Sequence, residues 1–292
     1  MSQTIITHDG KFHADDVFAV AALLCLTPQG KVLRTRDTKS IAGGDFVVDV
    51  GGVYDEKTNR FDHHQVGGAG VRQHADAVIP YAAFGLVWKK FGEKLAGTVE
   101  IAKRVDAVLV APIDANDNGI DLSTPAIQGV STYEMSDAIR AFIPTWQEDA
   151  DINASFNEAV GFAKRIIGRE IKRAEAVVAG KRKVEEAYAV SADKRLIVLD
   201  EDYSWKDTLA KFPEPLYVVH PQNETWRLYC VRDNPHLFAN RKDLPAAWAG
   251  LRDSHLEKVT GVLGAIFAHR NRFMAVAKSK EGALALAKQA LE

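Results

Sequence analysis

Histidines and aspartates gather in the first 120 residues of this 292-residue chain. Four of its nine histidines lie within the first 64 residues, and each has an aspartate within a few positions. Imidazole and carboxylate groups together are typical ligands of divalent transition metals. The clustering therefore predicts a metal site, assembled from four short motifs that read THDGKFHADD, VVDVGG, RFDHHQ and IDANDNG.

The first motif lies between an apolar run and a helical pattern. This order places His8 at the end of a strand, and His13, Asp15 and Asp16 around the start of a helix. Ligands of open α/β sheets bind at the carboxyl ends of strands. Successive helical residues diverge by about 100°, so at most one of the two aspartates should face the site. A plainer interpretation stays open, in which both aspartates only favour the first helical turn through the backbone dipole.

The second and third motifs place polar residues directly after apolar runs. Asp49 lies near the end of the apolar run FVVDV. A buried lone carboxylate is costly unless it is paired or ligated, which suggests that Asp49 bridges metal ions. The alternative is an aspartate that caps the Gly51–Gly52 bend. In an extended RFDHHQ segment, Asp62 and His64 share one face and His63 takes the other. One histidine can then ligate metal while the other meets a substrate phosphate or is oriented by a carboxylate.

The fourth motif resembles half of a calcium-binding loop. Asp114, Asn116, Asn118 and Gly119 match the start of an EF-hand, but Pro125 stands where its bidentate glutamate should be, which excludes one. We expect DANDNG to be a loop that delivers Asp114 to the metal cluster, with an Asx-turn as the alternative. The motifs GxxxxGK[ST], GxSxG and HExxH are absent, which excludes their catalytic classes.

The elements that must position these residues follow from periodicity. Short apolar runs alternate with helical patterns, which predicts an α/β fold. We expect strands at 4–7, 32–35, 46–50, 196–199, 216–219, 226–231 and 264–268. We expect helices near 14–26, 81–91, 98–110, 154–189 and 280–291, with a short one between 127 and 146. The helix expected over 154–189 is long and contains no proline. It therefore predicts three parts: a domain over 1–150, a connecting helix over 151–190 and a second, smaller α/β domain over 191–292.

Composition excludes several classes of protein. Apolar residues make up 47% and charged residues 26%, which is typical of a globular chain. The longest apolar stretch, Val17 to Leu26, has about half the length of a membrane-spanning helix. A net charge of -2 gives no cationic field for nonspecific duplex binding. Cys25 and Cys230 lie far apart, which argues against a disulfide framework and favours buried thiols. The N-terminus lacks a targeting pattern, so we expect a cytoplasmic protein.

Taken in order, THDGKFHADD, VVDVGG, RFDHHQ, YAAFGLVWKKFG and DANDNG resemble the MYG (melanocyte proliferating gene) branch of the DHH phosphoesterase superfamily. The later segments FPEPLYVV, WRLYCVR, NRKDLPAAWAGLRD and KEGALALA extend the resemblance over nearly the whole chain. It implies a parallel-sheet DHH-type N-terminal domain, a connecting helix and a C-terminal substrate domain, with divalent metal held between them. It also implies a 3′-to-5′ exonuclease that acts on RNA or single-stranded nucleic acid and releases nucleoside 5′-monophosphates.

The resemblance also assigns roles in the N-terminal part of the chain. His8 and Asp15 match the first motif of the family, Asp49 the second and Asp114 the fourth. Asp62, His63 and His64 match the third motif. His13 stands where many members of the superfamily carry an aspartate, which makes one ligand set softer. The expected metal ligands are therefore His8, His13, Asp15, Asp49, His63 and Asp114. We expect Asp62 and His64 to act in catalysis and Asp16 to turn away from the site.

The C-terminal part is expected to bind substrate. The family commonly has a glycine-containing stretch after a histidine, but this chain reads HRNRFMAVA from His269. Arg252, His269, Arg272 and Lys278 are the expected phosphate-binding residues, with a solvated basic loop as the alternative. Aromatic side chains such as Trp226 and Phe273 are candidates for base stacking, and core packing is the alternative for both.

The expected cofactor is Mn²⁺ in a two-metal site, with Mg²⁺, Co²⁺ or Zn²⁺ as alternatives. Expected partners are RNA, single-stranded nucleic acid or short oligonucleotides and no membrane, and the assembly stays open between monomer and homodimer. Two other functions remain possible at this point. One is a phosphohydrolase that acts on a dinucleotide, a cyclic dinucleotide or pyrophosphate. The other is a nucleic-acid-binding protein that has lost its catalytic activity.

Overall fold

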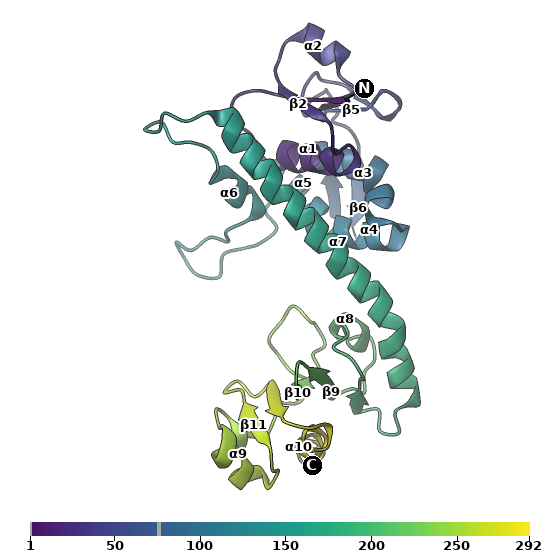
Figure 1. The fold of residues 1–292 in the computed structure, drawn as a ribbon, viewed down its shortest axis with the longest axis vertical. Helices are drawn as coiled ribbons and strands as arrows, with labels where there is room; N and C mark the ends of the chain where they lie inside the picture. Colours follow the sequence, from purple (N-terminus) through teal and green to yellow (C-terminus); the bar gives the residue numbers. More distant parts are fainter. Residues whose placement is uncertain (1, 75–76) are drawn as a thin grey trace. The chain divides into compact units, whose positions relative to one another are not determined.

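The chain forms two compact units, Met1–Ala174 and Glu175–Glu292. They are seen in a computed structural model that describes residues 2–74 and 77–292. Both units combine helices with a β-sheet, so the expected α/β class is confirmed. Along the chain, the boundary between the two units lies within helix α7 (Ile152–Val190), which Figure 1 shows as one continuous helix. The predicted helix over 154–189 matches α7 to within two residues at each end.

A five-stranded sheet forms the centre of the first unit. Its strands are β1 (Thr4–Thr7), β2 (Lys31–Arg34), β3 (Phe46–Val48), β4 (Tyr54–Asp55) and β5 (Arg60–Phe61). Their order is β2-β1-β3-β5-β4, and all neighbours are parallel except the antiparallel pair β4 and β5. The parallel strands β1, β3 and β5 are adjacent, so their carboxyl ends lie at one edge of the sheet. The residues that come after these three strands are therefore brought together.

Helices pack beside this sheet. The described elements of the first unit outside the sheet are α1 (Ala14–Leu26), α2 (Thr38–Gly43), the 3-10 helix Glu56–Thr58, the strands β6 (Val71–His74) and β7 (Ala77–Pro80), α3 (Ala83–Ala96), α4 (Val99–Val105), the π-helical segment Asp106–Val110, α5 (Ala111–Asp117) and α6 (Met135–Arg140). Residues Ala14 to Leu23 of α1 are all buried, and the helix packs against α3 and contacts β1 and β3. An apolar sequence on every side of a helix is typical of such a central position.

The prediction of a loop over DANDNG is wrong for the first half of this segment. Asp114 to Asp117 belong to α5, and the chain leaves the helix only at Asn118 and Gly119. Pro112 lies in the first turn of α5, where a missing N–H is tolerated, so it does not end the helical run. Gly119 has a φ of 72°, which suits the residue after a helix end.

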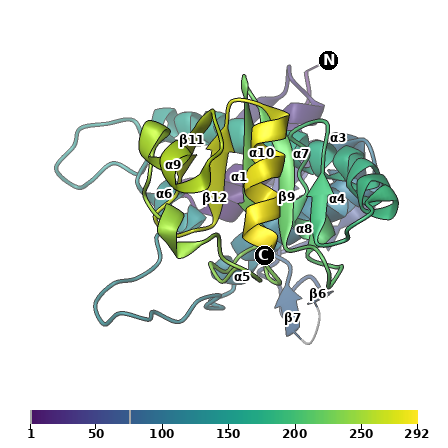
Figure 2. The same cartoon turned by 90° about the horizontal axis from the view of Figure 1, so that it is seen from below.

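The second unit is built on a separate five-stranded sheet. Its strands are β8 (Leu196–Val198), β9 (Tyr217–Gln222), β10 (Thr225–Cys230), β11 (Ala265–Ala268) and β12 (Met274–Ala277), in the order β11-β12-β10-β9-β8. Its remaining elements are α8 (Lys206–Leu209), the 3-10 helix Ala246–Trp248, α9 (Asp253–Thr260) and α10 (Lys280–Leu291). Helix α10 packs on β9, β10 and β12, as Figure 2 shows from below. Strand β12 was not expected, because HRNRFMAVA was interpreted as a substrate-binding stretch.

The long helix contributes to both hydrophobic cores. Phe156, near its start, is fully buried and packs edge-on against Phe12 of the first unit, with ring centroids 5.4 Å apart. Val184, near its end, belongs to an apolar cluster with Ile197 and Leu209 of the second unit. Among the described residues, no helix has the length and hydropathy needed to span a bilayer. Cys230 is buried as expected, whereas Cys25 is exposed, so that expectation is wrong for Cys25.

Helices α3 and α5 approach closely at Gly85. The Gly85 N–H donates a hydrogen bond to Asp114 Oδ1 at 3.0 Å. A Cβ atom added at Gly85 would lie only 1.8 Å from Asp114 Oδ2. Asp114 is also paired with Arg72, whose Nη1 lies 2.8 Å from Oδ2. The missing side chain at Gly85 therefore makes room for a buried ion pair.

We expect Gly85→Ala to lower the free energy of unfolding by about 1–3 kcal/mol, because the new methyl group must displace Asp114 or separate the helices. The matched control is Gly168→Ala in α7, where the added Cβ meets nothing within 4 Å. That change should stabilise the chain by about 0.5–1 kcal/mol through helix propensity. Chemical denaturation of both variants measures the difference, and equal effects would contradict the close packing at Gly85.

Candidate metal centre

The carboxylate of Asp49 lies between two imidazoles at the carboxyl edge of the first sheet. His8 follows β1, and its Nε2 lies 3.3 Å from Asp49 Oδ2. His63 follows β5, and its Nε2 lies 3.3 Å from Asp49 Oδ1. Asp49 itself follows β3 with a φ of 55°, in the left-handed region that non-glycine residues rarely adopt. Strained backbone of this kind clusters at functional sites.

Both aspartates at the start of α1 face the same edge. Asp15 and Asp16 have no solvent exposure. Asp15 Oδ2 lies 3.7 Å from His63 Nε2, and Asp16 Oδ2 lies 3.4 Å from His8 Nε2. Asp16 Oδ1 accepts the His13 backbone N–H at 2.8 Å, as the third residue of a helix does in a capping box. The expectation that Asp16 turns away is wrong, because this cap directs its other oxygen toward His8.

The carboxylate that α5 brings to the site is Asp117, not Asp114. Asp117 Oδ2 lies 3.3 Å from His63 Nε2. Asp114 is fully buried, and its oxygens face Arg72 and the Gly85 N–H. The expected ligand role of Asp114 is therefore corrected. Because the segment is a helix and not a loop, Asp114 points between α3 and α5, while Asp117, one turn later, reaches the site.

Asp62 and His64 form a pair beside this cluster. Asp62 Oδ1 lies 2.8 Å from His64 Nδ1 and accepts the His64 backbone N–H at 3.1 Å. Asp62 Oδ2 accepts the Gly52 backbone N–H. Asp62 therefore orients His64 and the turn after β3. The His64 side chain is 63% exposed, and its Nδ1 lies 3.4 Å from Asp49 Oδ1. With Nδ1 held by Asp62, Nε2 is the nitrogen that a substrate can reach.

A cavity of about 1180 Å³, which includes solvent at its mouth, opens over this edge. Its lining includes four residues of the cluster that could hold a metal ion: His8, His13, Asp49 and His64. The remaining lining includes two cationic side chains, Lys11 and Arg36, and the backbone of Gly51 and Gly52. Arg36 is also paired with Asp9 at 3.2 Å. Cations beside a carboxylate and imidazole cluster suit a polyanionic ligand.

The buried charges of the cluster are not balanced. Burial, together with the negative charges of Asp49, Asp117 and Asp16, raises the pKa of Asp15 well above its usual value. Burial also raises the pKa of Asp16 to about 7, even though His8 opposes the shift. Burial would raise the pKa of Asp49 as well, but the imidazoles of His63 and His8 lower it to about 2. The cluster therefore gathers more carboxylates than its imidazoles can neutralise.

Several atoms of this cluster are buried without a hydrogen-bond partner. They are Asp15 Oδ1, Asp16 Oδ2, Asp49 Oδ1 and His63 Nε2. Unsatisfied buried oxygens are costly, and a divalent cation would compensate them. Donor atoms within 4.8 Å of one another make up three groups among the described residues: His8, His13 and Asp49; Asp49, His63 and His64; and His13, Asp15 and Asp117. Asp49 and His13 each belong to two groups, and Asp49, which has two carboxylate oxygens, is suited to bridge two ions.

The expected substrate residues all lie in the second unit, where the Phe267 ring lies beside both Arg252 and His269. His269 and Arg272 share the turn between β11 and β12, where the Arg272 N–H donates to His269 O at 2.8 Å. Arg272 Nη2 also lies 2.6 Å from Asp243 Oδ2. Arg252 precedes α9 with its guanidinium 4.6 Å from the ring of Phe267, and Lys278 is exposed after β12.

Two residues of the cluster, Asp16 and Asp117, lie within the motifs but were not assigned to the site. Asp16 could have been recognised from its place three residues after His13, where an acidic side chain caps a helix. Asp117 could have been recognised from Asn118 and Gly119, which are typical of a helix end and therefore place Asp117 in its last turn. Both errors come from the local conformation of the motif and not from its residue types.

Comparison with known proteins gives one family over nearly the whole chain. A family model described as "MYG1_exonuc: Uncharacterised protein family (UPF0160)" matches residues 4–291. The human protein called MYG1 exonuclease is 32% identical, over 98% of this chain and 85% of the human one. The MYG1 protein of Schizosaccharomyces pombe is 29% identical, over 99% and 97% of the two chains. The MYG1 protein of Chlamydia pneumoniae is 30% identical, over 96% and 93%. The chain therefore belongs to the MYG1 exonuclease family.

Proposed function

We propose that this chain is a metal-dependent phosphodiesterase that removes nucleotides from the 3′ end of RNA or single-stranded nucleic acid in the cytoplasm and releases nucleoside 5′-monophosphates. The observation that carries the proposal is the group of buried, unsatisfied carboxylate and imidazole atoms around Asp49. Relatives named exonuclease support the nuclease class. The resemblance to DHH phosphoesterases supports the polarity and a DHH-type layout, with a metal-binding first unit and a substrate-binding second unit.

The side chains of the first unit have distinct parts in this proposal. His8, His13, Asp15, Asp49, His63 and Asp117 would hold the cations. Asp16, whose carboxylate lies beside His8, is at the edge of the group. Mn²⁺ is the preferred ion, because a mixed nitrogen and oxygen donor set suits manganese, cobalt or zinc better than calcium. When bound, such cations lower the pKa of a coordinated water and neutralise charge on a phosphodiester.

The residues around the ions would position the substrate. His64, which Asp62 orients through Nδ1, presents Nε2 to the cavity, where it can bind a phosphate oxygen or give a proton to the leaving oxygen. Lys11 and Arg36 line the same cavity and can bind further phosphates. Asp62 acts through His64 and the Gly52 turn, so it is a positioning residue.

The activity is tested on a 5′-labelled single-stranded oligonucleotide. We expect progressive shortening from the 3′ end with Mn²⁺, complete loss of activity with EDTA, and recovery with manganese but not to the same level with calcium. Chromatography should identify nucleoside 5′-monophosphates. Parallel turnover of a dinucleotide, a cyclic dinucleotide, pyrophosphate and bis-p-nitrophenyl phosphate tests the small-molecule alternative. Hydrolysis of the small substrates alone would reject the exonuclease.

We expect Asp117→Asn to weaken Mn²⁺ binding by at least about tenfold, because it removes a charged donor from one of the three groups. Asp121→Asn, which changes an exposed carboxylate nearby, is the matched control and should bind manganese as the wild type does. Asp114→Asn should lower the melting temperature through the Arg72 pair and leave manganese binding within about threefold of wild type. Calorimetric titration of the three variants checks both assignments, and a reversed order for Asp114 and Asp117 would refute them.

Manganese affinity should fall as the pH is lowered. Burial would lower the pKa of His8 and of His63, but the carboxylates around them outweigh it and raise both values in the metal-free chain. Both imidazoles must lose a proton before they can ligate, so protons compete with the ion below these raised values. We expect the Kd for Mn²⁺ to rise by about tenfold or more between pH 8 and pH 6. A constant Kd over this range would exclude the two histidines as ligands.

A further inference from the structure

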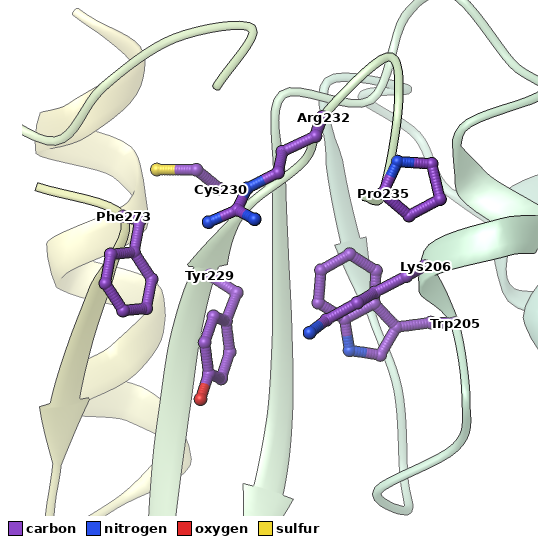
Figure 3. Close-up of a pocket in the computed structure, with 7 residues that line it drawn as sticks. All are labelled: Trp205, Lys206, Tyr229, Cys230, Arg232, Pro235 and Phe273. Atoms are coloured by element: carbon purple, nitrogen blue, oxygen red, sulfur yellow. The ribbon is translucent and has the colours of Figure 1, made fainter. Parts of the chain in front are cut away.

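A pocket in the second unit combines aromatic rings with positive charge. It holds about 370 Å³, including solvent at its mouth. Trp205 and Lys206 come from the start of α8, Tyr229 from β10, Arg232 from the segment after β10, and Phe273 from the residue before β12. Figure 3 shows Tyr229 between Phe273 and Trp205, with the ends of Lys206 and Arg232 directed toward the same space. The pocket shares no lining residue with the cavity at the metal centre.

The aromatic wall of this pocket is held in a fixed orientation. The Tyr229 and Phe273 rings stack with centroids 6.2 Å apart and planes at 27°. On β9, the buried ring of His220 lies nearly parallel to Tyr229, with centroids 5.6 Å apart and planes at 7°. His220 is fixed by contacts of its Nδ1 with Asp202 and with the Pro221 carbonyl oxygen. A preordered wall of this kind binds a flat ring without a large loss of side-chain freedom.

Charge at the pocket favours an anionic ligand. Its other lining residues are Cys230 and Pro235, so it has two cations and no carboxylate among the described residues. The Arg232 guanidinium lies 5.7 Å from the Phe273 ring, and its Nη1 and Nε donate to Leu237 O and Asn240 Oδ1. These acceptors orient the guanidinium but do not neutralise it. The contacts described for Arg232 are with neutral acceptors and aromatic rings, and the contact described for Lys206 is with the ring of Trp205.

An exposed aromatic side chain continues this surface. Phe238 is 88% exposed, and the Arg232 guanidinium lies 5.2 Å from its ring. The sequence pattern had suggested Trp226 and Phe273 as stacking candidates. Phe273 lines the pocket, whereas Trp226 lies against the core of the second unit and beneath Lys280. Flat rings next to unpaired cations match the chemistry of single-stranded nucleic-acid binding, in which bases stack on aromatic side chains and basic groups follow the phosphates.

We propose that this pocket binds one nucleotide of a single-stranded nucleic acid, with the base against Tyr229 and Phe273 and a phosphate at Lys206 and Arg232. The proposal rests on the proposed nuclease function for the identity of the ligand as substrate. Phe238 then offers a stacking surface to the neighbouring base. An apolar peptide is a less suitable occupant, because it would leave the two cations without counter-charges.

Binding of fluorescein-labelled hexauridylate to the full chain, measured by polarisation in EDTA, tests the pocket without hydrolysis. Uridine 5′-monophosphate should compete at least about tenfold better than ribose 5-phosphate, which lacks the base. Uridine without phosphate should also compete less well than the monophosphate. Equal competition by the monophosphate and ribose 5-phosphate, or displacement by an apolar peptide but not by nucleotides, would overturn the proposal.

Lys206 and Phe238 are exposed and Arg232 is half-buried, so variants at these positions do not disturb the core. Lys206→Met and Arg232→Met should each weaken hexauridylate binding by about three- to tenfold and reduce the slope of log affinity against log salt by about 0.7. Phe238→Ala should weaken binding by about fivefold or more. The matched controls are Lys211→Met for charge and Leu263→Ala for exposed apolar surface, and both should bind within about twofold of wild type. Pocket variants that bind as tightly as these controls would overturn the proposal.

Failure of the pocket and failure of the nuclease function can be told apart. Hydrolysis of bis-p-nitrophenyl phosphate by the wild type with Mn²⁺ reports on the metal centre alone. If the wild type hydrolyses it and the pocket variants bind hexauridylate normally, only the pocket proposal is wrong. If the wild type hydrolyses no phosphodiester but the variants lose nucleotide binding, the pocket proposal holds and the nuclease function is wrong.

Discussion

The main constraint on the first unit is the burial of several carboxylates at one edge of its sheet. Asp15 and Asp16 are fully buried, and Asp49 is nearly so, and the imidazoles of His8 and His63 lie within 3.7 Å of their carboxylates. A chain would not gather these groups for stability alone, because desolvation of like charges opposes folding. The surrounding elements compensate by fixing each group: a capped helix start for Asp16, a strand end for Asp49 and a helix end for Asp117.

Adjacent parallel strands make this gathering possible from distant parts of the sequence. His8 and His63 are 55 positions apart, yet β1, β3 and β5 are neighbours, so the residues after them meet at one edge. The same rule let the position of the site be predicted from the sequence, because polar residues directly after apolar runs mark strand ends.

The sequence predicted elements better than it predicted the direction of side chains. The bounds of β1, α1 and α10 agree with the expected ranges, because each has a clear apolar pattern with polar flanks. Asp16 and Asp114 were assigned wrongly, because a rotation of one helical turn or a cap decides where a side chain points, and neither leaves a periodic pattern. Strand β12 was missed because its four residues are all apolar and show no alternation, so the stretch was interpreted only as a substrate-binding segment. The aromatic pocket joins α8, β10 and the residue before β12, so it depends on tertiary packing that a linear pattern does not contain.

Helix α7, which belongs in part to each unit, restricts where insertions and deletions can be accepted during evolution. Each residue added to a helix rotates the downstream chain by about 100° and moves it by about 1.5 Å along the axis. One extra residue between Phe156 and Ile167, which are both buried on α7, would therefore turn Ile167 away from the face that Phe156 buries, or force the helix to bulge. Loops accept changes in length with little cost, but within α7 the helical register fixes which residues are buried. Variation in length should therefore concentrate outside α7, in segments such as 118–134 and 232–244, where the chain has little regular structure.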